Sequence, residues 1–153
     1  MSLRAQIHDA LKQAMKAGDK RRISTLRLMN SAIKDKDIGS RTEGHASALT
    51  PDAGLVDLFA KMVKQRQEST AAYEQGGRPE LAQAEREEIA IIQSFMPKQL
   101  SDEDAKAAVA AVIKAVGAAS VKDMGKVMAE LKAKYAGQMD MAKAGAIVKG
   151  LLE

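Results

Sequence analysis

The stretch FMPKQLSDED, residues 95–104, ends one helix and begins another. Pro97 has no backbone N–H to donate, and its ring clashes with the preceding turn, so a helix must end before it. Ser101, followed three residues later by Asp104, is a variant of the capping box that starts a helix. A stop and a start this close together predict a domain boundary, with an N-terminal helical domain at 1–96 and a C-terminal domain at 97–153.

Before this boundary, apolar residues recur every three or four positions, which is the period of amphipathic helices. Ser2 is placed to cap a first helix, and AGDK at residues 17–20 breaks it. Asp19 can cap a second helix, and the small, turn-forming residues at 39–51 predict a loop after it. The N-terminal domain therefore begins with a helical hairpin.

A second hairpin is predicted beyond that loop. Thr50 is placed as the N-cap of a third helix, with Pro51 at its first helical position. The pair Gly76-Gly77 ends this helix, and a fourth helix is expected from Arg78 to about Phe95.

Three further helices are expected after the boundary. Gly117 ends the first, Ser120 with Asp123 starts the second, Gly137 ends it, and Asp140 caps the third. No window alternates with the period of two that marks a half-buried strand. The predicted fold is all-α, with N-terminal helical hairpins followed by a C-terminal three-helix domain.

The composition is that of a globular protein, with 46% hydrophobic and 29% charged residues. There is no cysteine, hence no disulfide and no thiolate ligand or nucleophile. No apolar run approaches the roughly 18 residues of a membrane span, and the N-terminus lacks the apolar region of a signal peptide. These features predict a cytoplasmic protein with no membrane partner.

No catalytic constellation is recognisable. The chain has only two histidines, His8 beside Asp9 and His45 in the predicted loop, and neither lies in a zinc-binding HExxH pattern. No glycine-rich phosphate loop occurs either. The sequence therefore predicts no catalytic residue, no metal site and no cofactor, and it argues against an enzyme in its own right without deciding the question.

Basic residues are the remaining signal. The net charge is +4, and residues 97–153 hold nine lysines against seven acids. Lys122 and Lys126 are four residues apart and are expected on one helix face. The candidate nucleic-acid-binding residues are Lys122, Gly125, Lys126, Lys132, Lys134 and Lys143. By charge alone, a solvated helix face explains them better.

Gly125 lies between two of these lysines, where a glycine costs about 1 kcal/mol relative to alanine. The favoured explanation is close packing against another helix, a purpose that Gly145 can share. The alternative is an RNA backbone that lies across Gly125 between Lys122 and Lys126.

The chain also resembles a known family. Its C-terminal region is similar to that of YqeY-like proteins, and to the tail domain of the GatB subunit of the glutamyl/aspartyl-tRNA amidotransferase. The stretches that carry the resemblance are LKQAMKAGDKRRISTLRLMNSAI (11–33), VKQRQESTAAYEQGGRPEL (63–81), FMPKQLSDED (95–104) and GAASVKDMGKVMAELKAKYAGQMD with IVKGLL (117–152).

The resemblance implies a two-part helical architecture and a C-terminal domain that contacts tRNA, with the amidotransferase chemistry in other domains and subunits. The resulting hypothesis is a tRNA- or RNA-binding accessory protein that is not catalytic by itself. The alternative is a protein-interaction adaptor for an amidotransferase or another translation-linked enzyme. Many family members carry an arginine where Gln138 stands; if that arginine served an anion, Lys134 or Lys143 would have to replace it.

Overall fold

The computed structural model of the chain describes residues 1–42 and 49–153. Over these residues it contains seven α-helices, one short 3-10 helix and no strand, so the prediction of an all-α fold is confirmed. The helices form two compact units, Met1–Met96 (unit 1) and Pro97–Glu153 (unit 2). That each unit is an independent domain stays a prediction.

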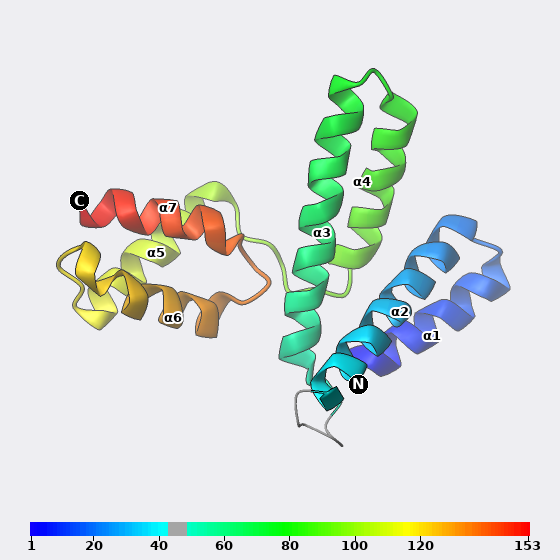
Figure 1. Ribbon diagram of the computed structural model, residues 1–153, viewed down its shortest axis with the longest axis horizontal. Coiled ribbons are helices and arrows are strands. Elements are labelled where there is room, and N and C mark those ends of the chain that lie inside the picture. The colour runs from blue at the N-terminus through cyan, green and yellow to red at the C-terminus, as the bar shows by residue number, and fades with distance from the viewer. Residues whose placement is uncertain (43–48) are drawn as a thin grey trace. The chain divides into compact units, whose positions relative to one another are not determined.

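Unit 1 consists of two helical hairpins (Figure 1). Helices α3 and α4 pack against each other along their length, and α2 packs on both α1 and α4. The four helices are α1 (Leu3–Ala17), α2 (Lys20–Thr42), α3 (Asp52–Gln75) and α4 (Pro79–Gln93). Their fully buried side chains form one apolar core that includes Ile7, Leu26, Met29, Leu55, Phe59 and Ile92.

The first helix begins and ends, and the second helix begins, where the sequence predicts. The Ser2 hydroxyl accepts a hydrogen bond from the Ala5 N–H at 3.2 Å and caps α1. Gly18 adopts the left-handed conformation, with φ of 69°, and ends this helix. The Asp19 carboxylate accepts from the Arg22 N–H at 3.1 Å at the start of α2.

Two predictions in unit 1 are wrong. Helix α2 continues to Thr42, so the first residues of the predicted loop are helical. Thr50 does not cap α3; Pro51 occupies the N-cap position, with no capping hydrogen bond from a side chain. The reason is that Thr50 bonds toward the first hairpin instead: its N–H donates to Asp37 at 3.0 Å, and its carbonyl accepts from Arg4 at 2.9 Å. The second histidine, His45, lies outside the described residues.

A partly buried ion pair joins the start of α1 to the end of α2. The Arg4 guanidinium donates from Nη1 and Nη2 to the two carboxylate oxygens of Asp37, at 2.9 and 2.8 Å. Such a bidentate pair is strong and geometrically specific. These hydrogen bonds from Arg4, together with the bond from the Thr50 N–H, hold the pKa of the Asp37 carboxyl well below its usual range. Through Thr50, the same pair also fixes the chain that leads into α3.

Unit 2 is a three-helix unit. Its three α-helices are α5 (Asp102–Val116), α6 (Met124–Tyr135) and α7 (Met141–Leu152), and a short 3-10 helix, η1 (Val121–Asp123), precedes α6. The Ser101 hydroxyl accepts from the Asp104 N–H at 3.1 Å, and the Asp140 carboxylate accepts from the Ala142 N–H at 2.8 Å, so both predicted caps are confirmed. The buried core consists of Val109, Val112, Val127, Leu131, Ala144 and Val148.

The segment after Pro97 is hydrogen-bonded to the turn between α6 and α7. The Leu100 N–H donates to the Gln138 carbonyl at 2.8 Å, and the Gln99 side chain donates to the Gly137 carbonyl. Gly137 has φ of 76°, a left-handed conformation that favours glycine and ends the helix as predicted. The backbone of Gln138 is therefore held within unit 2.

Candidate nucleic-acid interface

The carboxylate of Asp123 holds the backbone before α6 by hydrogen bonds. Asp123 accepts hydrogen bonds from the backbone N–H groups of Ala119, at 3.0 Å, and Ser120, at 3.4 Å. These two bonds, with the nearby positive charge of Lys126, lower the pKa of Asp123. The predicted start signal is real, but it opens a turn of 3-10 helix, η1, before α6 itself begins. Asp123 thus fixes the backbone that carries Lys122 and Lys126.

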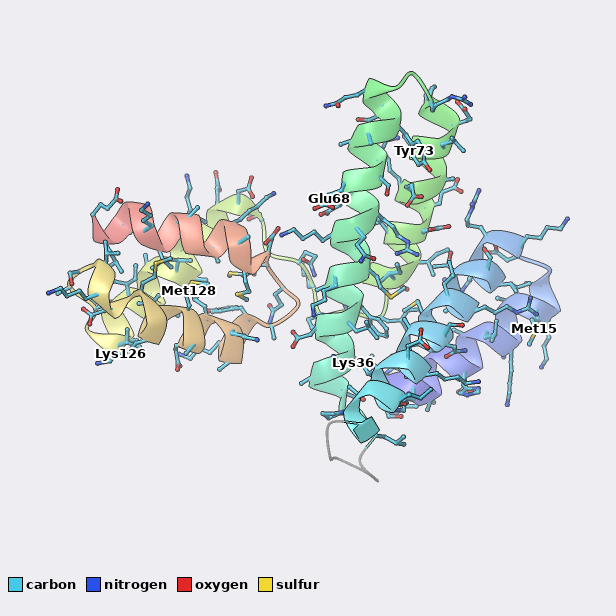
Figure 2. All side chains as sticks on the ribbon, viewed as in Figure 1. Met15, Lys36, Glu68, Tyr73, Lys126 and Met128 are labelled. Atoms are coloured by element: carbon cyan, nitrogen blue, oxygen red, sulfur yellow. The ribbon has the colours of Figure 1, made fainter. Side chains whose placement is uncertain are left out.

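Helix α6 buries one face and exposes the other. Val127 and Leu131 are fully buried in the core of unit 2, while Lys122, Gly125 and Lys126 are exposed. Figure 2 shows Met128 between α6 and α7, whereas Lys126 projects away from the other helices of the unit. The two lysines that flank Gly125 are therefore both available to a partner.

Gly125 lies in open space. A Cβ atom added to this residue would have no neighbouring atom within 4 Å. The favoured prediction, that Gly125 allows close helix packing, is therefore wrong. Gly145 of α7 does face α6, because its added Cβ would lie 3.6 Å from the Met124 methyl carbon and 3.9 Å from that of Met128.

The other candidate lysines are spread around the outer surface of unit 2. Lys132 and Lys134 of α6 and Lys143 of α7 are all exposed, and Lys134 pairs with Glu130 at 3.3 Å. At 3.6 residues per turn, Lys126, Lys132 and Lys134 point in different directions around α6. The structure therefore does not gather the six candidates into one compact site; five of them lie on η1 and α6, and Lys143 lies on α7.

Small residues continue this exposed face beyond Gly125. Ala129 and Ala133 follow at intervals of four, so they share its side of the helix, and both are exposed. Neither alanine was among the residues predicted to bind RNA, although their spacing of four and eight residues from Gly125 indicates that they share its side of the helix. Together with Gly125, Lys122, Lys126 and Lys132, they form what we call the α6 outer face.

The chemistry of unit 2 suits a polyanion better than a base sequence. Its positive charge comes from nine lysines and no arginine. Lysine is a point charge without the planar fork with which arginine reads guanine. Tyr135 is the one aromatic residue of unit 2, and it is only half-exposed, so stacking of bases on aromatic side chains can contribute little to binding. Contact with phosphate groups is therefore the mode of nucleic-acid binding that these residues suit best.

In residues 1–42 and 49–153, no three histidine or acidic side chains cluster in a way that could hold a metal ion. Within that described part, no helix has the length and apolar character needed to cross a membrane.

Comparison with known proteins decides the family. The sequence profile described as "Yqey-like protein" matches residues 4–152, which is nearly the whole chain. The chain belongs to the YqeY-like family. This YqeY-like membership was expected from the four stretches that carry the resemblance, and it is confirmed.

Curated relatives of this YqeY-like chain come from yeasts and are named "Altered inheritance of mitochondria protein 41, mitochondrial". The Eremothecium gossypii protein is 35% identical over 92 residues, which are 60% of this chain and 48% of the relative. The Kluyveromyces lactis protein is 33% identical over 91 residues, 60% of this chain and 46% of the relative. The match thus spans about half the length of these relatives.

These names also correct one prediction. The sequence predicts a cytoplasmic protein, whereas the relatives of this YqeY-like chain are named as mitochondrial proteins. The cytoplasmic prediction rested on the absence of cysteine and of an apolar leader. Neither observation distinguishes the cytoplasm from other reducing compartments, and a mitochondrial transit peptide is not apolar.

Proposed function

We propose that this chain binds structured RNA such as tRNA through the α6 outer face, with Lys143 of α7 nearby in sequence, and that it does not catalyse a reaction by itself. The observation that carries the proposal is Gly125, exposed and open between two exposed lysines. Gly125 is the second residue of α6, and no neighbouring helix among the described residues requires a glycine there. A ligand that approaches the backbone closely supplies the reason.

Lysines and small side chains together fit an RNA backbone. Lys122 and Lys126 can neutralise phosphates on either side of Gly125, which supplies affinity without base specificity. Gly125, Ala129 and Ala133 leave the space that a sugar–phosphate chain needs. With no exposed arginine fork in unit 2, recognition is by shape, as is usual for double-stranded RNA. The resemblance to the amidotransferase tail domain supports tRNA as the RNA.

The first test compares charge-reversed variants for tRNA binding at two salt concentrations. The Lys122→Glu/Lys126→Glu variant should bind bulk tRNA at least about tenfold more weakly than the unmodified chain at low salt, because two phosphate contacts become repulsive. Its salt dependence should also be shallower by about one to two units of log K per log salt. Filter binding or fluorescence anisotropy measures both quantities.

The matched control is Lys98→Glu/Lys106→Glu, which changes the charge of unit 2 equally through two other exposed lysines. It should keep most of the affinity, and circular dichroism should show the same helicity in both variants. No tRNA binding by the unmodified chain at low salt would remove the proposal. Equal losses in both variants would remove the α6 outer face from it.

Replacing Gly125 with alanine should separate stability from binding. We expect unit 2 to gain about 0.5–1 kcal/mol, because alanine is the better helix former and its methyl group meets no neighbour. The affinity for tRNA should fall, because the same methyl group holds the RNA backbone away. Denaturant unfolding and the binding assay measure the two effects.

Gly150→Ala is the control for this variant, since Gly150 of α7 is equally open. It should not weaken tRNA binding. An unchanged affinity in Gly125→Ala would contradict a close approach of RNA at this position.

A further inference from the structure

A row of basic and hydroxyl side chains follows the exposed side of α2 in unit 1. The members recur at alternating intervals of four and three residues, so they lie on one side of the helix. All five are exposed, whereas Leu26, Met29 and Ile33 on the opposite side are buried in the core of unit 1. This α2 basic row consists of Lys20, Ser24, Arg27, Ser31 and Lys34.

The three cations of the α2 basic row have no ion-pair partner within residues 1–42 and 49–153. The neighbouring Arg21 differs, because it pairs with Glu87 of α4 at 3.2 Å. Asp35 lies on the adjacent side of α2, next to Lys34 in sequence, and is the acid that follows the row most closely. Within the described residues, the row is therefore a line of three unpaired cations on one helix, with a single acid, Asp35, beside its end.

The spacing of the row suits a regular polyanion. Successive cations are seven residues apart, or about 10.5 Å along the helix, so Lys20 and Lys34 are about 21 Å apart. The phosphates of a nucleic-acid backbone repeat at a much shorter distance, so each cation can neutralise a different phosphate and further phosphates fall in the intervals. Ser24 and Ser31 occupy these intervals, and serine hydroxyls are regular phosphate contacts.

We propose that the α2 basic row is a second RNA-binding surface, which contacts the phosphate backbone of an RNA duplex. The choice of RNA rests on the proposed function of unit 2, but the surface and its residues are different. An anionic membrane fits the row less well. Amphipathic helices bind membranes by burying an apolar face in them. Leu26, Met29 and Ile33 of α2 are already buried in unit 1, and the exposed Leu28 and Ile38 are too few to form such a face.

The test measures binding of a fluorescein-labelled 20-base-pair RNA duplex to the full chain by fluorescence anisotropy. Lys20→Gln/Arg27→Gln/Lys34→Gln should weaken binding at low salt by at least about tenfold and reduce the salt slope by about two to three units. The control Lys12→Gln/Lys16→Gln/Lys61→Gln removes the same charge from other exposed lysines of unit 1. It should lose clearly less affinity.

A gain-of-function variant protects the test against misfolding. Asp35→Asn removes the acid beside the row and should tighten RNA binding by about twofold. Equal losses in the row variant and its control would overturn the inference, because net charge would then explain both. Binding to phosphatidylglycerol vesicles that needs the row, with RNA binding unchanged by its loss, would overturn it as well.

This experiment can disprove the α6 outer face and the α2 basic row independently of each other. If Lys122→Glu/Lys126→Glu binds the duplex like the unmodified chain while the row variant does not, the proposed function of the α6 outer face is wrong and the α2 basic row stands. If only the Lys122→Glu/Lys126→Glu variant loses binding, the α2 basic row is wrong and the proposed function stands.

Discussion

Replacing Phe59 with alanine should lower the unfolding free energy of unit 1 by about 3–5 kcal/mol and leave unit 2 unaffected. Phe59 is the largest side chain in the chain that is fully buried, and it lies in the shared core of both hairpins of unit 1. Truncation removes its apolar contacts and leaves a cavity that the surrounding helices cannot fill. The core of unit 2 contains none of these residues.

Hydrogen-exchange mass spectrometry in rising urea measures this effect, with peptides from 1–96 and 97–153 followed separately. The reciprocal control is Leu131→Ala in the core of unit 2, which should cost that unit about 2–5 kcal/mol. If either substitution shifts both sets of peptides equally, the chain unfolds as one cooperative body, and the predicted division into independent domains is wrong.

Replacing Asp37 with alanine should lower the unfolding free energy of unit 1 by about 2–3 kcal/mol. The substitution leaves the partly buried Arg4 guanidinium with the Thr50 carbonyl as its remaining hydrogen-bond acceptor, and it leaves the Thr50 N–H without its acceptor. Urea unfolding measures the loss. Asp35→Ala, an exposed acid two residues away, is the control and should change stability by less than about 0.5 kcal/mol.

A double variant separates the ion pair from its surroundings. Arg4→Met/Asp37→Leu should cost less than the sum of the two single losses, because neither residue is then left as an unpaired charge. Additive losses would show that Arg4 and Asp37 act independently.

The same pair makes stability depend on pH. The pKa of Asp37 is lowered in the folded chain, so its contribution is present above the unfolded pKa of about 3.9 and is lost as pH falls toward the lowered value. Between about pH 5 and pH 3, the stability of unit 1 should therefore fall more steeply in the unmodified chain than in Asp37→Asn. Parallel curves would contradict the lowered pKa.

Most helix ends could be predicted from the sequence because their signals are local. Ser2, Asp19, Ser101 and Asp140 each bond a backbone N–H within the next three residues, and Gly117 has φ of 67° directly after α5. Such caps need no knowledge of the rest of the chain. The all-α fold class follows from the same local patterns and from helical periodicity.

The two wrong predictions in unit 1, the end of α2 and the N-cap of α3, concern segments whose structure depends on a residue far away in the sequence. Residues 39–42 look like a loop because glycine and serine favour turns, yet α2 continues through them. Asp37, in the preceding turn of α2, is bound by Arg4, which lies 33 residues earlier in the chain. The same pair draws the Thr50 backbone away from the capping geometry that its sequence suggests. No local sequence pattern indicates that Asp37 is paired with a residue 33 positions away.

The candidate site shows a different limit. The sequence correctly placed Lys122 and Lys126 on an exposed face, because their spacing fixes them relative to the buried stripe of α6. It could not decide between packing and exposure for Gly125, since a glycine has no side chain whose polarity indicates a face. Only the tertiary structure shows that, among the described residues, no atom would lie within 4 Å of a Cβ added there.

The exclusive use of lysine in unit 2 also determines how its charge can be removed. Acylation turns a lysine ammonium into a neutral amide, whereas an arginine guanidinium is not changed by it. Unit 1 holds eight arginines, but unit 2 sets nine lysines against seven acids with no arginine in reserve. A single kind of amine modification can therefore take unit 2 through neutrality to a negatively charged surface, one residue at a time, while unit 1 keeps its guanidinium charges.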